Sequence, residues 1–162
     1  MMIKNYYKRG NNRGITLIEV VVVMFIIGIF AAAVLPHFRN TLDSANLMSA
    51  AGKLKDDLHY IHNFAVTNHR STWFTVDINS NSYSYGIYST PPSSDPVELT
   101  DPATGQPAII HLDDYHSVIT SETLGGGFEY SWWGTPSNSG QIVLNGTKTI
   151  VIEAESGYIY EL

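Results

Sequence analysis

An uninterrupted apolar run near the N-terminus dominates the hydrophobic pattern of the chain. Residues 20–35 carry no charged or strongly polar side chain, and extending the run back to residue 15 adds one acid, Glu19. About 20 residues at 1.5 Å each span the roughly 30 Å hydrocarbon core of a bilayer. The run is rich in β-branched residues, but in lipid a helix is favoured because it satisfies its own backbone hydrogen bonds. We therefore predict a transmembrane helix over residues 15–36.

The hydrophobic pattern changes to an amphipathic helix after Pro36. Apolar side chains recur there at intervals of three and four, which predicts a helix over residues 37–71 with one buried stripe. The stripe consists of Leu47, Ala51, Leu54, Leu58, Ile61 and Ala65. Pro36 removes one backbone hydrogen bond, so the helix is expected to kink or loosen there. The charged residues between the stripe positions are expected to face water: Asp43, Lys53, Lys55, Asp56 and Asp57.

From residue 72 onward, the pattern is that of short strands separated by turns. Alternating apolar and polar residues predict strands at 72–78, 83–88, 109–112, 117–120, 128–133, 141–144, 149–154 and 158–162. Residues 79–82 and the pair Asn145-Gly146 have the composition of hairpin turns. We expect an α+β fold in which the long helix packs on an antiparallel sheet, with a β-rich head over residues 72–162.

The charges that flank the apolar run predict its orientation in a membrane. Lys4, Lys8, Arg9 and Arg13 precede it without a single acid, and such a cluster stays on the cytoplasmic side. The candidate cleavage point, Gly14, lies before the apolar run, whereas a secretory signal is cut after it. An acid within a membrane helix marks function by default. The alternative interpretation is an uncleaved signal anchor with Glu19 among the lipid headgroups.

With Gly14 as the last residue before the cut, the N-terminus resembles type IV prepilins and pseudopilins. The residues that carry the resemblance are Gly14, Thr16, Leu17, Glu19, Gly28 and Pro36. The resemblance implies a leader, residues 1–14, that a prepilin peptidase removes between Gly14 and Ile15. It also implies N-methylation of Ile15, although Phe or Met is usual at that position. Glu19, Gly28 and Pro36 are then the assembly residues, and the helix between the last two is the part expected to unwind.

The last third of the chain carries a second resemblance. Residues 128–144, followed by Gly157 and a final strand, are similar to the C-terminal half of H-type minor pseudopilins (GspH/FimT-like). Some pilus-associated members bind DNA through a Gly-Arg-x-Arg end. This chain has Gly157-Tyr-Ile-Tyr-Glu161 instead, which lacks both cations. Binding of nucleic acid is therefore not expected.

The composition agrees with an exported structural subunit. Cleavage would remove 14 of 162 residues and four of nine cations, leaving five against fifteen acids and a net charge of −10. Such a charge disfavours a nucleic-acid surface, which needs a basic patch. The chain has no cysteine. Many pilus-forming pilins close a C-terminal loop with a disulfide, so its absence favours a pseudopilin or minor pilin.

Several groups of residues suggest chemistry but are better explained by packing or solvation. His59, His62 and His69 lack a further ligand at metal spacing. The acids Asp95, Glu98, Asp101, Asp113 and Asp114 match no calcium loop. Trp132 and Trp133 could form a binding face, but packing explains them equally well. No catalytic motif is recognisable. The sequence predicts no enzyme, no cofactor and no metal site.

The functional hypothesis is a minor pseudopilin or pilin-like structural subunit of a type II secretion system or a related type IV pilus machine. It would be a single-pass protein of the bacterial inner membrane with a periplasmic head. Its expected partners are other pilin or pseudopilin subunits, the prepilin peptidase, the inner-membrane assembly platform and the lipid bilayer. The alternative is a tip subunit, adhesive or DNA-binding, that recognises a ligand through its head.

Overall fold

The computed structural model describes residues 14–89 and 95–162, with the backbone alone for 35–40. The chain divides into two compact units, one ending at Thr41 and the other formed by Leu42–Leu162. The second unit is the head. The predicted leader lies, apart from Gly14, outside the described residues.

One long helix, α1 (Leu17–Asn68), contributes to both units. Its backbone is helical through Gly28 and Pro36, so neither residue ends the element. The helix ends in a Schellman-type turn, in which His69 adopts a left-handed φ of 50° and the Arg70 N–H donates to the Ala65 carbonyl (3.1 Å). This end falls where the sequence pattern predicted it.

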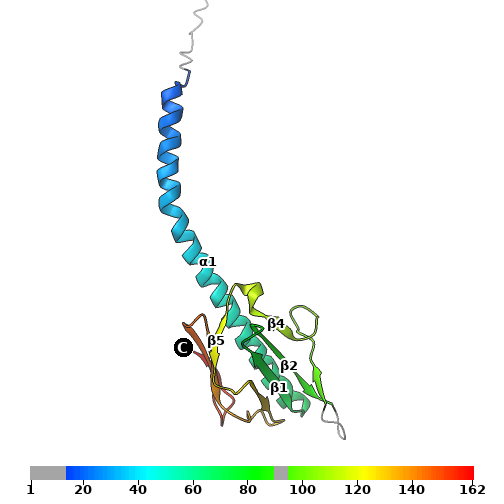
Figure 1. The fold of residues 1–162 in the computed structure, drawn as a ribbon. Coiled ribbons are helices and arrows are strands. Elements are labelled where there is room, and N and C mark those ends of the chain that lie inside the picture. The colour runs from blue at the N-terminus through cyan, green and yellow to red at the C-terminus, as the bar shows by residue number, and fades with distance from the viewer. Residues whose placement is uncertain (1–13, 90–94) are drawn as a thin grey trace, which may run out of the picture. The chain divides into compact units, whose positions relative to one another are not determined.

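The head contains two antiparallel sheets, where the sequence predicted a single sheet (Figure 1). The first has the order β3-β2-β1-β6, and β4 also pairs with β2. Its strands are β1 (Thr72–Asp77), β2 (Ser82–Tyr88), β3 (Pro96–Glu98), β4 (Ile109–His111) and β6 (Gly127–Tyr130). The second has the order β5-β7-β8-β9: β5 (Ile119–Glu122), β7 (Gly140–Leu144), β8 (Lys148–Ile152) and β9 (Ile159–Glu161). A short 3₁₀ helix, η1 (Leu112–Tyr115), lies between β4 and β5. The predicted α+β class is confirmed.

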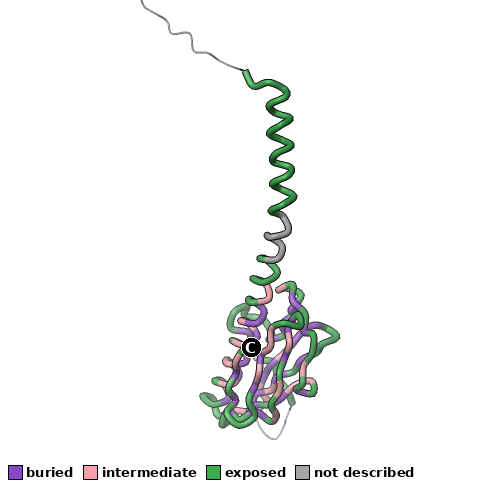
Figure 2. Tube along the Cα trace, turned by 90° about the vertical axis from the view of Figure 1, so that its left-hand side faces the viewer, coloured by how far each residue is buried: buried purple, intermediate pink, exposed green. Residues whose placement is uncertain are grey.

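The core of the head is formed by α1 and both sheets. The predicted stripe on α1 is buried at Ala51, Leu54, Leu58, Ile61 and Ala65, and Leu47 packs against it at partial exposure. Figure 2 shows this burial confined to the head portion of α1. The sheets contribute alternate residues of their strands, as expected for sheets with one covered face. Among them are Phe74, Tyr83, Tyr85, Phe128, Tyr130, Ile142, Leu144, Ile150 and Ile159.

Asn81 connects the two sheets. It occupies the β1–β2 turn with a left-handed φ of 50°. Its side-chain amide donates to the Ser117 carbonyl (2.8 Å), and its side-chain oxygen accepts from the Ile119 N–H (2.8 Å). These bonds hold the start of β5 against a turn of the first sheet.

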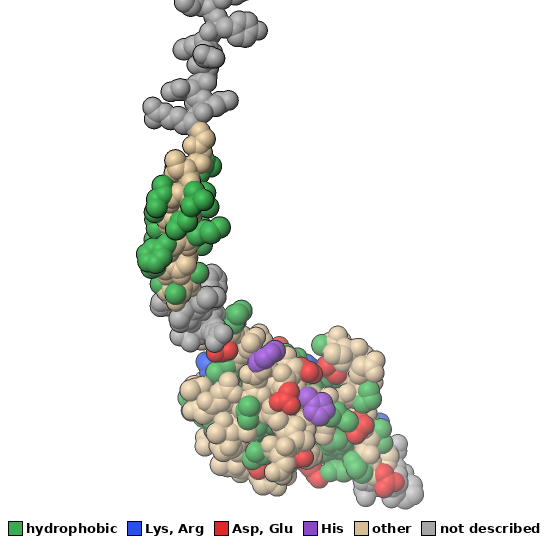
Figure 3. Space-filling view, turned by 45° about the horizontal axis from the view of Figure 1, so that its top comes forward, with side chains coloured by type: hydrophobic (Ala, Val, Ile, Leu, Met, Phe, Trp, Pro, Cys, Tyr) green, Lys and Arg blue, Asp and Glu red, His purple; other side chains and the backbone are tan. Residues whose placement is uncertain are grey.

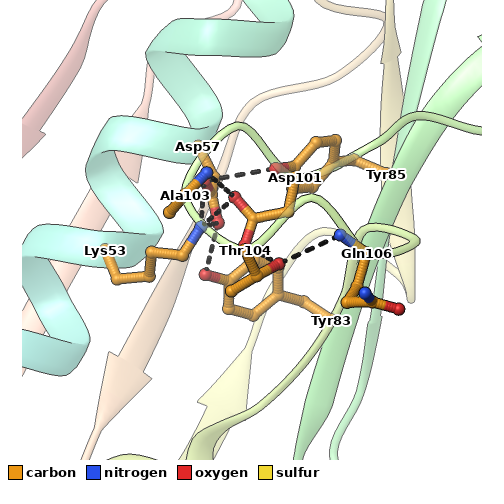
Figure 4. Close-up of polar contacts among 8 residues, drawn as sticks. All are labelled: Lys53, Asp57, Tyr83, Tyr85, Asp101, Ala103, Thr104 and Gln106. Atoms are coloured by element: carbon orange, nitrogen blue, oxygen red, sulfur yellow. Dashed lines mark hydrogen bonds and ion pairs between the residues drawn. The ribbon is translucent and has the colours of Figure 1, made fainter.

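The prediction that Lys53 and Asp57 face water is wrong. Asp57 is only 4% exposed, and its carboxylate accepts two hydrogen bonds from the Lys53 ammonium at 2.7 and 2.9 Å. Lys53 also donates to Asp101 (2.9 Å), and the hydroxyl of Tyr83 donates to Asp57 (2.8 Å), as Figure 4 shows. These contacts stabilise both charges inside the head, because each buried charge has an opposite partner.

The predicted strands are found, most with bounds shifted by one or two residues, and two differences are larger. The strand predicted over 128–133 ends at Tyr130, because the next residues form a turn closed by a Gly134 N–H to Ser131 carbonyl bond (2.8 Å). Gly134 has a φ of +85° there, which glycine adopts without strain. β3 lies between the strands predicted at 83–88 and 109–112, where no strand was predicted.

Candidate assembly segment

The described side chains of residues 14–34, which we call the assembly segment, are all exposed in the isolated chain. Within it, Leu17–Val34 has a mean hydropathy of 2.9 and no buried residue, and it is long and apolar enough to cross a membrane. Hydrophobic side chains are visible along this helix in Figure 3. A helix that is apolar all round must be covered by lipid or by other apolar helices. Nothing in the described part of the chain covers this one.

Thr16 caps the N-terminus of α1. The Glu19 N–H lies 3.1 Å from the Thr16 carbonyl oxygen and 3.3 Å from its side-chain Oγ1. The spacing Thr16-x-x-Glu19 is that of a capping box, in which a Ser or Thr cap and an acid at the third helical position stabilise the first turn. This spacing is visible in the sequence, although the expected role of Glu19 in assembly does not depend on it.

Glu19 lies in the first turn of α1. The N-terminal end of a helix carries a partial positive charge that stabilises a carboxylate, typically by about 0.3–1 kcal/mol. The position of Glu19 therefore has a local explanation as well as the assembly role expected from the sequence. Any test of the assembly role must separate the two.

Gly14 and Ile15 precede the helix and are exposed. A Cβ added at Gly14 would meet no atom within 4 Å, so the fold does not require glycine there. No described residue therefore covers the peptide bond between Gly14 and Ile15.

Gly28 is a second glycine that the isolated chain does not need. A Cβ at this position would also meet no atom within 4 Å. Glycine inside a helix costs about 1 kcal/mol relative to alanine. Its presence is explained if another helix approaches closely or if the backbone must open.

Pro36, the third predicted assembly residue, has a helical backbone, and its side chain lies outside the description.

Two of the three histidines that suggested a metal site contact aromatic rings. His62 contacts Tyr130 edge-on with ring centroids 5.1 Å apart, and His69 contacts Trp132 in the same way at 5.9 Å. No group of three His, Asp or Glu side chains within residues 14–89 and 95–162 is arranged to hold a metal ion.

The acids that suggested calcium are partly engaged within the chain. Asp101 binds Lys53, and its side chain also accepts from the Ala103 N–H (3.0 Å) and the Thr104 hydroxyl (3.0 Å). Asp113 accepts from the amide of Asn81 (2.6 Å). These contacts explain two of the five acids as structural residues.

Comparison with known proteins supports both sequence resemblances. The family description "prokaryotic N-terminal methylation motif" matches residues 9–35. The minor pseudopilin EpsH from the type 2 secretion system of Vibrio cholerae shares the fold, with a TM-score of 0.53 and 12% identity over 71% of this chain and 94% of that one. The type IV minor pilin FimU of Pseudomonas aeruginosa, in one crystal form, gives a TM-score of 0.49 and 15% identity. The match covers 72% of this chain and 88% of FimU. No curated protein sequence matches the chain.

The predicted resemblance to type IV prepilins is therefore confirmed at the N-terminal motif, and the resemblance to H-type minor pseudopilins is confirmed at the level of the fold. The motif match includes Gly14, Ile15, Glu19 and Gly28 and stops just before Pro36. The α+β fold is shared with a minor pseudopilin head. The chain is thus type IV pilin-like in its N-terminal motif and in its fold.

Proposed function

We propose that this protein is a minor structural subunit that assembles with other pilin-type subunits into a periplasmic filament of a type II secretion system or a related type IV pilus machine. The observation that carries the proposal is an N-terminal methylation motif on a helix that is exposed on every side and leads into a minor-pseudopilin fold. Lipid would cover the helix before assembly, and the helices of neighbouring subunits would cover it afterwards.

Processing is the first step of the proposed pathway. Prepilin peptidase cuts between Gly14 and Ile15, removes leader 1–14 with its four cations, and methylates the amine of Ile15. Residues 15–36 then hold the protein in the inner membrane as a single span, with residues 37–71 and the β-rich region 72–162 on the periplasmic side. The cationic leader explains this orientation, because clusters of Lys and Arg stay in the cytoplasm.

Glu19 directs assembly in this proposal. A carboxylate buried among apolar helices without a partner is strongly disfavoured. The processed N-terminus of a neighbouring subunit supplies that partner, since the methylated amine of Ile15 keeps its positive charge. Such a pair would also fix the axial position of each subunit, as single buried polar contacts do in coiled coils.

The protein works by assembly and not by catalysis in this proposal. Both similar solved proteins are pilin or pseudopilin subunits. The assembly platform of the inner membrane is the remaining expected partner, because a subunit without an enzymatic site depends on other proteins for its extraction from the bilayer.

Mass spectrometry of the protein purified from cells with active prepilin peptidase tests the processing step. The wild-type chain should begin at N-methylated Ile15. Gly14→Val should keep its leader, because a bulky residue before the cut blocks entry to the peptidase, while Gly14→Ala should still be processed. A wild-type chain that begins at Met1 or Met2 in such cells would contradict the proposal.

A ligand-binding tip subunit is the second candidate. The observation in its favour is the pair Trp132 and Trp133, whose rings stack with centroids 3.6 Å apart while Trp133 remains 70% exposed. Exposed indoles of this kind are typical of recognition surfaces. Trp133→Ser would then abolish adhesion or cargo secretion while filaments still form. Filament loss in that variant would instead favour the shaft role.

A further inference from the structure

The outer face of the first sheet carries a row of four residues that the core does not use. The strand registers pair Glu98 with Gly86, and Trp73 with both Gly86 and Glu129. Paired residues of antiparallel strands point to the same face. The row Glu98–Gly86–Trp73–Glu129 therefore crosses four strands on the face opposite the buried Phe74.

Glycine at position 86 lets the indole of Trp73 lie against the sheet. A Cβ there would stand 2.1 Å from the backbone oxygen of Val97 and 2.6 and 2.7 Å from Cζ2 and Cε2 of the indole, so a side chain would displace both the neighbouring strand and the ring. The indole Nε1–H donates to the Ile87 carbonyl (3.1 Å), which fixes the orientation of the ring. Trp73 lines a groove of about 310 Å³ together with Thr75, Tyr88, Pro96 and Glu98.

Two carboxylates flank this indole. Glu98 lines the groove on one side. Glu129, beside Trp73 on the other, accepts a hydrogen bond from the hydroxyl of Tyr88. Neither acid has an ion-pair partner among residues 14–89 and 95–162. Arg70 donates to the Tyr88 backbone carbonyl (2.9 Å) and does not line the groove.

We propose that this groove binds an arginine side chain of a partner protein. A cation is attracted to the face of an aromatic ring, and tryptophan binds cations more strongly than tyrosine or phenylalanine. A planar guanidinium both stacks on the ring and forms hydrogen bonds with carboxylates. The groove supplies the ring and the carboxylate of Glu98, Glu129 lies beside Trp73 on the neighbouring strand, and no cation lines the groove. The site differs from the assembly segment, and the inference does not depend on the proposed filament.

A second copy of this chain is a poor source of the arginine. The head's own cations are largely engaged: Lys53 binds Asp57 and Asp101, Lys148 binds Glu161, and Arg70 binds a backbone carbonyl. Cleavage of the leader would leave a strongly acidic chain. A basic side chain on a different protein complements this charge, and like-charged copies disfavour each other.

Fluorine NMR of the full chain in detergent micelles tests the proposal. The chain has three tryptophans, so labelling with 5-fluorotryptophan gives one resonance for each, and Trp73→Phe identifies that of Trp73. The probe is the peptide Gly-Gly-Arg-Gly-Gly, and the control peptide contains citrulline, a neutral isostere, in place of arginine. We expect a saturable shift of the Trp73 resonance with the arginine peptide and none with the citrulline peptide.

Variants of the two acids complete the test. The double variant Glu98→Gln/Glu129→Gln should weaken binding by about tenfold, because both charge-assisted contacts become neutral. Glu155→Gln, an exposed acid elsewhere in the head, should bind like the wild type. If the double variant melts early, Glu98→Gln alone must still weaken binding.

Three results would overturn the proposal. Equal shifts with the arginine and citrulline peptides would mean that charge is not recognised. Shifts confined to Trp132 and Trp133 would place the basic peptide on the other aromatic surface. Unchanged affinity in the glutamine variants of a folded protein would show that the acids do not contribute.

Discussion

At the residue scale, the ion network of Lys53, Asp57 and Asp101 is the feature that most constrains the head. Burial raises the pKa of the Asp57 carboxyl above its usual 3.8, and the hydrogen bonds from Lys53 and Tyr83 offset this only in part. Burial alone would lower the pKa of Lys53, but its hydrogen bonds to Asp57 and Asp101 outweigh burial and raise it. Burial would raise the pKa of Asp101, yet the hydrogen bond from Lys53 holds it below its usual range. The Lys53 ammonium thus lowers the pKa of both acids, and the Ala103 N–H and the Thr104 hydroxyl lower that of Asp101 as well.

Replacing that ammonium should destabilise the head in a pH-dependent way. Lys53→Met leaves two buried carboxylates without their cation, and we expect a loss of about 3 kcal/mol at pH 7. This is the low end for a broken buried pair, because the Lys53 side chain is 14% exposed. In the variant the folded-state pKa of Asp57 rises further above its unfolded value. The deficit should therefore shrink as pH falls through that raised pKa, where the carboxyl becomes neutral.

Urea unfolding of the full chain in micelles, followed by tryptophan fluorescence at pH 7 and at mildly acidic pH, measures this effect. Lys55→Met is the matched control, since Lys55 lies on the same helix without an ion pair closer than 4 Å in the described chain. A deficit that is the same at both pH values would mean that lost packing, and not unpaired charge, causes the destabilisation.

The network also shows what sequence patterns miss at this scale. An acid four residues after a lysine on a helix is the usual sign of an exposed pair. Asp57 is buried because Tyr83 and Asp101, 26 and 44 residues further along the chain, close over it in the folded head. Contacts between residues so far apart in the chain produce no periodic pattern in the local sequence.

At the element scale, the amphipathic part of α1 behaves as its pattern predicted. Every stripe position from Ala51 to Ala65 is buried, because a period of three and four places these residues on one face of a helix. The division of the strands into two sheets was not predictable in the same way. Alternation along a strand identifies its buried face but carries no information on which strand it pairs with.

Truncation of a stripe residue should cost far more than truncation outside the stripe. Leu58 is completely buried, and Leu58→Ala should lower the free energy of unfolding by about 2–5 kcal/mol. Met48, on the same helix, is 66% exposed, so Met48→Ala should change it by less than about 0.5 kcal/mol. The midpoint of urea unfolding in micelles gives both values. Comparable losses in the two variants would mean that this face of α1 does not form the core.

At the scale of the whole molecule, the two units have opposite relations to solvent. The head buries its own apolar residues, whereas the described side chains of the assembly segment bury none. The sequence predicted this contrast, because an apolar run without periodicity has no polar face to turn to water. The capping arrangement at Thr16 was also predictable, because the spacing Thr16-x-x-Glu19 is that of a capping box.

Two explanations of Glu19 now make different predictions for the assembled protein. If Glu19 acts through its charge on the amine of a neighbouring Ile15, both Glu19→Gln and Glu19→Ala should lose assembly. If it acts only by stabilising the first turn of α1, Glu19→Gln should assemble normally, because glutamine also completes a capping box. Glu19→Ala would then be the impaired variant. The glutamine variant therefore decides between charge and capping.

We expect the charge explanation to hold. Both variants should be cleaved and inserted in the membrane like the wild type, because the cut lies before the helix and the apolar run is unchanged. Crosslinking in membranes, with partner subunits co-expressed, should give wild-type yields for the parent chain and little product for either variant. Thr16→Ala is the control for capping: it removes the Oγ1 contact to the Glu19 N–H (3.3 Å) and keeps the acid, so it should still assemble. Normal crosslinking of Glu19→Gln would contradict a charge pair, because an uncharged amide cannot replace the carboxylate opposite a buried amine.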